Sequence, residues 1–252
     1  MSHGGNWAAA ALRMKRPARA FTDFSANINP FGFPRAVGKA LEAALRDVGR
    51  YPDPLCGDFR RAAAARHRVR PDEILPGNGA AELVHLAARA LRDRPALILS
   101  PSFSEYATAC SVEGVPVSFI RARSSGGFSL DSSSILSRVA RRRRCAVWAA
   151  NPNNPTGRLL RSVWLEKLVR VCLAREHVLI LDEAFLDFSR GGEGRSWATR
   201  APRRGLLVLR SLTKSFAVPG LRVGYAVGPK ALLDARKRFQ PPWSVNALAQ
   251  AA

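Results

Sequence analysis

Lys214 is the residue of this chain best placed for nucleophilic chemistry. It lies in RSLTKSFAVPGLRVGY, between a strand-like apolar run and a Pro-Gly turn. A lysine just past a buried strand is partly desolvated, which favours its neutral, nucleophilic form. A Schiff base with an aldehyde cofactor needs such an amine. On its own, this position of Lys214 is equally compatible with an ordinary surface lysine.

Asp182 is a second candidate for the same chemistry. It follows the apolar residues Val178 to Leu181, so we expect it at the end of a buried strand. A carboxylate is costly there unless it has a partner. A protonated pyridine nitrogen would be such a partner, and it would make the ring an electron sink. A helix cap or a nearby arginine are the alternatives.

Two turn-rich segments add polar groups that could bind a cofactor. NPNNPTG (Asn151 to Gly157) follows the apolar run CAVWAA, and its prolines make a rigid loop that can aim an asparagine side chain. GNGAAE (Gly77 to Glu82) places glycines ahead of an expected helix, whose free N–H groups can bind a phosphate. Both segments are also compatible with ordinary turns.

Apolar runs alternate with helix-length segments from about residue 75 onward, which predicts an α/β fold with a mostly parallel central sheet flanked by helices. In such sheets ligands collect at the carboxyl ends of the strands, so we expect these four polar segments at one cleft. We expect a short helix near 7–12, one helix at 34–45 among extended arms, and a surface loop over 189–205. The expected strands cover 96–100, 115–120, 145–150, 178–184, 206–211 and 222–228, and the expected helices of the sheet domain cover 80–92 and 162–176.

Composition limits the partners and the compartment. The 252 residues have a net charge of +21, but the basic residues are spread along the chain and form one dense cluster, Arg141 to Arg144. Because no nucleic-acid-binding motif accompanies them, we expect no nucleic-acid partner. No uncharged apolar stretch reaches the ~18 residues of a membrane span, so we expect no membrane partner. The four cysteines have no paired spacing, which indicates buried thiols and a cytoplasmic location.

Together, GNG, NPNNPTG, DEAF and SLTKSFAVPGLRVGY resemble, in this order, the fold-type I pyridoxal-phosphate (PLP) enzymes of the class I/II aminotransferase family. This resemblance implies that PLP is the cofactor and that Lys214 is the catalytic lysine that binds it. It further implies that Asp182 pairs with the pyridinium nitrogen, that Asn154 hydrogen-bonds the ring O3′, and that Phe103 stacks on the ring. Tyr51 would reach the phosphate of a neighbouring subunit, which implies a homodimer. The implied phosphate-binding positions in the same chain are Gly79, Ala80, Ser211, Thr213 and Arg222.

One position departs from the family pattern. The family often has a tyrosine three residues after the aspartate, where its hydroxyl donates to O3′, but this chain has Phe185. The resemblance therefore implies that O3′ depends more on Asn154.

Two subfamilies are similar to the chain. YPDP, NPNNPTG and the lysine motif are shared with histidinol-phosphate aminotransferases. HGGN at His3, DFSANINPFG, PSFSEY, DEAFLDF and PWSVNALAQAA resemble the L-threonine O-3-phosphate decarboxylases of cobalamin biosynthesis more closely, over nearly the whole chain. That resemblance implies a PLP-dependent lyase that converts a small phosphorylated amino acid to aminopropanol phosphate, with His3 and Asn29 near the substrate phosphate. An aminotransferase of the histidinol-phosphate type and a non-catalytic PLP-binding remnant are the alternatives.

The same resemblance implies a domain organisation. We expect an N-terminal arm and helix over residues 1–50, the PLP-binding large domain over 51–240, and the start of a connection over 241–252. That connection would lead to a small C-terminal domain that is mostly missing from this sequence. In the family this domain normally supplies the arginines that grip the substrate, so its absence would impair activity.

Overall fold

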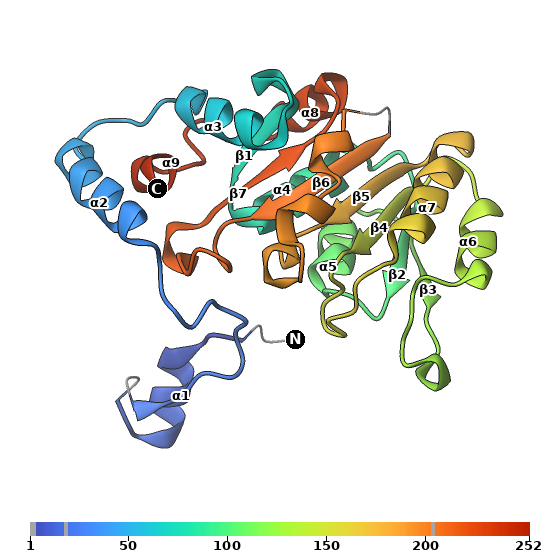
Figure 1. Ribbon diagram of the computed structural model, residues 1–252, viewed down its shortest axis with the longest axis horizontal. Helices are drawn as coiled ribbons and strands as arrows, with labels where there is room; N and C mark the ends of the chain where they lie inside the picture. Colours follow the sequence, from blue (N-terminus) through green and yellow to red (C-terminus); the bar gives the residue numbers. More distant parts are fainter. Residues whose placement is uncertain (1–3, 18–19, 203–204) are drawn as a thin grey trace.

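A computed structural model, which describes residues 4–17, 20–202 and 205–252, contains a seven-stranded sheet in the order β1-β7-β6-β5-β4-β2-β3 (Figure 1). Strands β2 to β6 pair in parallel, whereas β7 runs antiparallel to both β6 and β1. The expected mostly parallel sheet is therefore confirmed. The strands are β1 (Ile74–Asn78), β2 (Ala96–Ser100), β3 (Val117–Arg121), β4 (Ala146–Ala150), β5 (Val178–Asp182), β6 (Leu206–Ser211) and β7 (Val223–Val227).

Helices cover both faces of the sheet, and each strand contributes to both cores. Along β5, Leu179 and Leu181 pack with helices α3, α6 and α7, while Val178 and Ile180 pack with α4, α5 and α8. Because side chains alternate along a strand, a strand buried on both faces is apolar throughout. These helices are α3 (Gly57–His67), α4 (Gly79–Ala90), α5 (Glu105–Val112), α6 (Ser133–Ala140), α7 (Ser162–Ala174) and α8 (Lys230–Lys237).

The N-terminal segment contains α1 (Trp7–Met14) and α2 (Arg35–Ala44), which confirms the two helices expected there. In Figure 1, α1 lies apart from the sheet, whereas α2 lies beside α9 (Ala247–Ala251). A small apolar cluster that includes Val37, Val245 and Ala249 joins these two helices. Helix α2 and the C-terminal helix α9 are thus packed together. The division at residues 50 and 240 stays a prediction.

The expectation of a surface loop over 189–205 is wrong in its central part. Ser196, Trp197 and Ala198 are buried, and short 3-10 turns cover Gly192–Arg195 and Ala198–Arg200. The physical reason is the buried Glu183 carboxylate, which accepts hydrogen bonds from the Ser196 hydroxyl and from the backbone N–H of Trp197. The segment around Ser196 is therefore buried because the Glu183 carboxylate needs hydrogen-bond donors in the protein interior.

The cysteines confirm the expectation of buried thiols. Cys56, Cys110, Cys145 and Cys172 are all buried and free. Burial raises the pKa of the Cys172 thiol to about 12. Within the described residues, no helix combines the length and the apolar character that crossing a bilayer requires.

Candidate active site

A cavity of ≈ 150 Å³ lies at the carboxyl ends of β4, β5 and β6, next to the start of α4. The four polar segments singled out in the sequence meet at its walls, as expected for an open α/β sheet. Phe185, the residue that departs from the family pattern, also lines it. Eight predicted cofactor-binding residues line this cavity: Ala80, Phe103, Asn154, Asp182, Ser211, Thr213, Lys214 and Arg222.

Lys214 lies in a turn directly after β6. Its side chain is half-buried, and burial followed by the positive charge of Arg222 lowers the pKa of its amine below the usual value. Before it in the turn, the hydroxyls of Ser211 and Thr213 lie 2.8 Å apart, both buried. The environment therefore favours the neutral amine that nucleophilic chemistry needs.

Asp182 ends β5 and lies on the sheet face of α4 and α5. Its Oδ2 accepts a hydrogen bond from the Tyr106 hydroxyl at 2.6 Å, and its Oδ1 accepts one from the Ala184 N–H at 2.9 Å. Burial raises the pKa of Asp182, and these two donors oppose the rise. Both donors are neutral groups, so the carboxyl group is positioned to pair with a cation in the cavity.

Tyr106 is a site residue that the sequence analysis missed. It lies on α5, stacks on Trp148 with ring centroids 5.4 Å apart, and meets Phe103 edge to face at 5.7 Å. Burial and the charge of Asp182 raise the pKa of Tyr106 well above its usual value, so its hydroxyl stays protonated and donates. Its place in PSFSEY, three residues after Phe103, was the one available signal.

The other end of the cavity is built to bind an anion. Gly79 opens α4 with a φ of +76°, and a Cβ there would lie 2.5 Å from Nη2 of Arg222. Gly224 on β7 lets the backbone of Ala80 approach, because a Cβ at Gly224 would lie 2.8 Å from the Ala80 nitrogen. The guanidinium of Arg222 thus lies against the first turn of a helix whose N–H groups attract anions.

The polarity of the cavity fits PLP. Arg222 is positive and lies against Gly79 at the N-terminus of α4, where a phosphate binds well. Asp182 offers a carboxyl group whose hydrogen-bond donors among the described residues, the Tyr106 hydroxyl and the Ala184 N–H, are both uncharged. A ligand with a phosphate at one end and a protonated ring nitrogen at the other matches both ends.

Other predicted site residues lie elsewhere. The side chain of Tyr51 is 82% exposed and stacks on Trp243 at 4.8 Å, away from the cavity walls. The Asn29 side chain donates to the Ser215 carbonyl at 2.9 Å and accepts from the Phe31 N–H at 3.1 Å, so it holds backbone. His3 lies outside the described residues.

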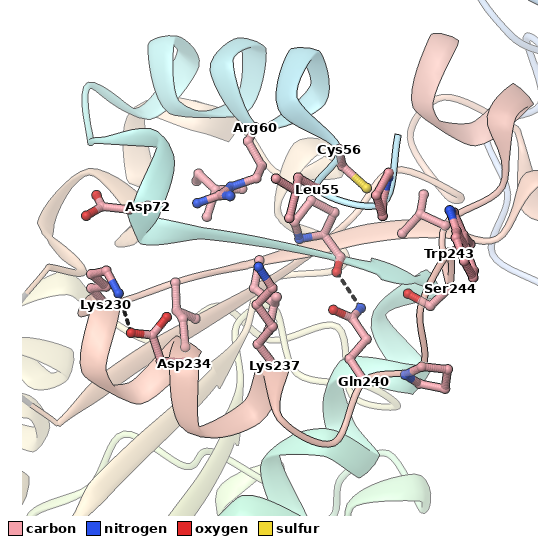
Figure 2. A pocket seen from close by; sticks show the side chains of 17 residues that line it. Leu55, Cys56, Arg60, Asp72, Lys230, Asp234, Lys237, Gln240, Trp243 and Ser244 are labelled. Carbon is pink, nitrogen blue, oxygen red and sulfur yellow. Dashed lines mark hydrogen bonds and ion pairs between the residues drawn. The ribbon is translucent and has the colours of Figure 1, made fainter. Parts of the chain in front are cut away.

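Two further cavities differ in their relation to the site. One of ≈ 550 Å³ shares Pro152, Asn154 and Phe185 with the first cavity and is closed on another side by Asn27 and Ile28 of the N-terminal arm. Another of ≈ 240 Å³ lies between α3, β1 and α8 (Figure 2) and contains none of the predicted site residues. The ≈ 550 Å³ cavity is therefore the one of these two that shares lining residues with the cofactor cavity.

Comparisons with known proteins agree with this geometry. Residues 19–252 match the family model of aminotransferase class I and II. The chain is 39% identical over 252 residues to the threonine-phosphate decarboxylase of Salmonella typhimurium, which covers 100% of this chain and 68% of that protein. It is 34% identical over 244 residues to the histidinol-phosphate aminotransferase of Limosilactobacillus fermentum, covering 95% of this chain and 66% of that protein. The crystal structure of the histidinol-phosphate aminotransferase from Clostridium acetobutylicum matches with a TM-score of 0.81 and 31% identity, over 91% of this chain and 67% of that one.

The strand order, the lysine turn after β6 and the carboxylate at the end of β5 define the large domain of a fold-type I PLP-dependent enzyme. The chain belongs to the class I and II aminotransferase family, and its cofactor is PLP. It spans about two-thirds of the length of the relatives that it matches.

Proposed function

We propose that this chain is the PLP-binding part of a threonine-phosphate decarboxylase, which converts L-threonine O-3-phosphate to aminopropanol phosphate and CO₂ in cobalamin biosynthesis. The observation that supports this choice best is the 39% identity, over the whole chain, to the Salmonella protein of that name. A histidinol-phosphate-type aminotransferase is the second candidate, supported by the relatives from Limosilactobacillus and Clostridium.

We assign the following roles to the residues at the cavity. PLP, when bound, supplies an aldehyde that an amine can attack and a ring that withdraws electrons from a bond at the substrate Cα. Lys214 binds it through its amine and afterwards returns a proton to Cα. Asp182 keeps a proton on the ring nitrogen, Asn154 donates to O3′, and Phe103 packs on the ring. The phosphate binds at Gly79, Ala80, Ser211, Thr213 and Arg222.

The choice between decarboxylation and transamination depends on how the substrate is held. The Cα bond that stands perpendicular to the ring is the one that breaks, so the residues that orient the substrate select the reaction. In the proposed reaction that bond joins Cα to the carboxyl carbon: it breaks to release CO₂, and a proton takes its place. The adjoining 550 Å³ cavity is where we place the substrate.

Cofactor binding by Lys214 is tested by adding PLP to the purified chain. We expect a visible absorption band that Lys214→Ala abolishes. Lys230→Ala is the matched control, because Lys230 is an exposed lysine paired with Asp234, and it should leave the band unchanged. A band that survives Lys214→Ala contradicts the assignment.

The reaction is tested with the loaded protein and two substrates. Release of CO₂ from threonine phosphate supports the decarboxylase. Glutamate formation from histidinol phosphate and 2-oxoglutarate, without CO₂ release, supports the aminotransferase. A band at Lys214 with neither product indicates that this chain binds PLP but does not catalyse either reaction.

We also propose that the cytoplasmic protein acts as a homodimer in which Tyr51 reaches the phosphate of the other subunit. The exposed, stacked pair of Tyr51 and Trp243 supports this arrangement, because exposed aromatic rings are typical of interfaces. Sedimentation analysis should find a dimer, and Tyr51→Phe should weaken PLP binding. A monomer that binds PLP equally well in both forms contradicts the proposal.

A further inference from the structure

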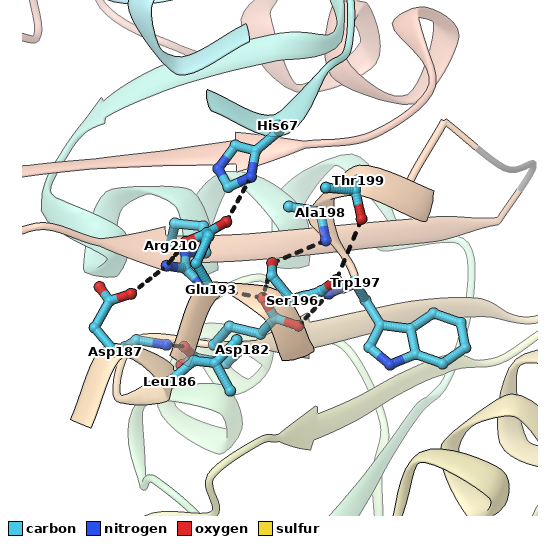
Figure 3. A network of polar contacts seen from close by, with 12 residues as sticks. His67, Asp182, Leu186, Asp187, Glu193, Ser196, Trp197, Ala198, Thr199 and Arg210 are labelled. Atoms are coloured by element: carbon cyan, nitrogen blue, oxygen red, sulfur yellow. Dashed lines mark hydrogen bonds and ion pairs between the residues drawn. The ribbon is translucent and has the colours of Figure 1, made fainter. Parts of the chain in front are cut away.

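Figure 3 shows a network of polar contacts whose charged members are buried or partly buried. Its centre is Arg210 on β6, whose side chain is 2% exposed. Nη1 of Arg210 lies 3.1 Å from Glu183, and Nη2 lies 2.8 Å from both Asp187 and Glu193. We call these four residues the Arg210 cluster. Arg210 directly precedes the cavity residue Ser211, and the two face opposite sides because side chains alternate along a strand.

The carboxylates of the Arg210 cluster have further partners that fix them in place. Glu183 accepts from the Ser196 hydroxyl at 2.6 Å. Glu193 accepts from Arg66 at 3.0 Å and lies 2.9 Å from Nδ1 of His67. Removing one partner from a buried ionised group leaves an uncompensated charge, so breaking the contacts of Arg210 and Glu183 is costly.

One arm of the Arg210 cluster reaches the lysine turn. Oδ1 of Asp187 binds Arg210, and its other oxygen, Oδ2, accepts a hydrogen bond from the hydroxyl of Ser215 at 3.0 Å. Ser215 directly follows Lys214. From the other side, the Asn29 N–H donates to the Lys214 carbonyl at 3.1 Å. The backbone that directly follows the Cα of Lys214 is therefore held at two points by residues from outside its own turn.

We propose that Asp187 is a positioning residue: anchored by Arg210, it holds the Ser215 hydroxyl and so fixes the direction in which Lys214 enters the cavity. The inference rests on the proposed role of Lys214. A lysine side chain has many rotamers, so its amine is confined only if its Cα is. A carboxylate bound to a buried guanidinium is a rigid anchor for that purpose, because charge-assisted hydrogen bonds are short and strong.

A matched control exists within the same network. The Ser196–Glu183 bond is also a hydroxyl-to-carboxylate bond of a buried cluster member, but Ser196 has no hydrogen bond to the lysine turn. Ser196→Ala and Ser215→Ala therefore each remove a hydroxyl-to-carboxylate bond, and Ser196→Ala in addition removes the acceptor of the Ala198 N–H. A merely structural network would respond alike to both, whereas a positioning role makes only Ser215→Ala change the bound cofactor.

The experiment uses the full chain loaded with PLP and measures the visible circular dichroism per unit absorbance, the rate of PLP loss on dilution, and the melting temperature. PLP is achiral, so its visible circular dichroism depends on being held in one orientation. We expect Ser215→Ala to lower this signal at least two-fold and to speed PLP loss about ten-fold. Ser215→Thr, which keeps the hydroxyl, should restore both. Ser196→Ala should lower the melting temperature without changing either.

Asp187→Asn tests the same step but also disturbs Arg210, so Ser215→Ala is the decisive variant. The inference is overturned if Ser215→Ala retains the wild-type signal and rate, or if Ser196→Ala changes them equally. Lys214→Ala distinguishes this failure from failure of the proposed function. If the wild-type band does not depend on Lys214, the assignment of the lysine is wrong and the positioning role is refuted with it.

Discussion

The hydrogen bond from Tyr106 to Asp182 should contribute directly to cofactor affinity. Without a ligand, the buried carboxyl group can take up a proton, because burial raises its pKa. Pairing with a protonated ring nitrogen requires the carboxylate instead. The Tyr106 hydroxyl, 2.6 Å from Oδ2, stabilises that ionised form. We therefore predict that Tyr106→Phe weakens PLP binding.

The magnitude follows from the chemistry of the bond. A hydrogen bond to a charged group contributes about 1.5–3 kcal/mol, and each 1.4 kcal/mol is a factor of ten, so the dissociation constant should rise about 10- to 100-fold. The ring of phenylalanine keeps the stacking on Trp148 and the contact with Phe103, so packing changes little. The pKa of Asp182 rises further in the variant. The loss of affinity should therefore be greatest at low pH and diminish as the pH rises.

The assay is a titration of PLP into the cofactor-free protein, followed by its visible absorption. Asp182→Asn and the double variant complete a cycle, in which Tyr106→Phe should cost less when residue 182 cannot ionise, because a neutral hydrogen bond contributes only about 0.5–1.5 kcal/mol. An equal loss in both backgrounds would refute this reasoning, as would an unchanged affinity.

Three other predictions concern backbone strain, acid stability and thiol reactivity. Gly79→Ala should lower the free energy of unfolding by about 1–2 kcal/mol, because φ is +76° there, and should weaken PLP binding by crowding Arg222. Gly220→Ala is the control, because a Cβ there has open space, and it should change neither quantity. Thermal melts and PLP titrations measure the two effects. Burial raises the pKa of Glu193, but the hydrogen bond with His67 and the charges of Arg210 and Arg66 outweigh it and hold the pKa at about 2. Stability should therefore fall as the pH drops from about 4.5 towards 2, by on the order of 3 kcal/mol, and Glu193→Gln should flatten that part of a denaturation profile. Cys172, buried with a pKa of about 12, should react with a thiol reagent only after unfolding; rapid labelling of the native chain would contradict the packing.

Much of the cofactor cavity could be predicted because its residues occupy the ends of strongly apolar strands. Asp182 and Lys214 stand out in sequence since each follows a buried run, and topology alone brings such ends to one edge. The strands over 96–100 and 206–211 match their predicted bounds. β1 could not be predicted, because ILPGN contains a proline and a glycine and acquires its extended form by pairing with β7.

The Arg210 cluster could not be predicted for a different reason. Its members are polar residues far apart in the chain, and only the fold brings them together on one face. The alternation of side chains along a strand gave one indication. If Asp182 faces the cavity, the adjacent Glu183 must face the opposite core, where its carboxylate needs a buried cation. The strand order determines which of the many arginines supplies that cation. The burial of Ser196 depends on the strand order too.

The antiparallel insertion of β7 also determines when the cofactor site can form. β7 lies between β1 and β6, and its pairing with β1 joins residues about 150 positions apart, a contact that is slow to form. Gly79 directly follows β1, and Arg222 directly precedes β7. An intermediate lacking β7 also leaves β1 unpaired, so it could have the five parallel strands and still no binding site for a phosphate. PLP would then bind only fully folded molecules and not partly folded ones. The rate of PLP binding would therefore report the rate of the last step of folding.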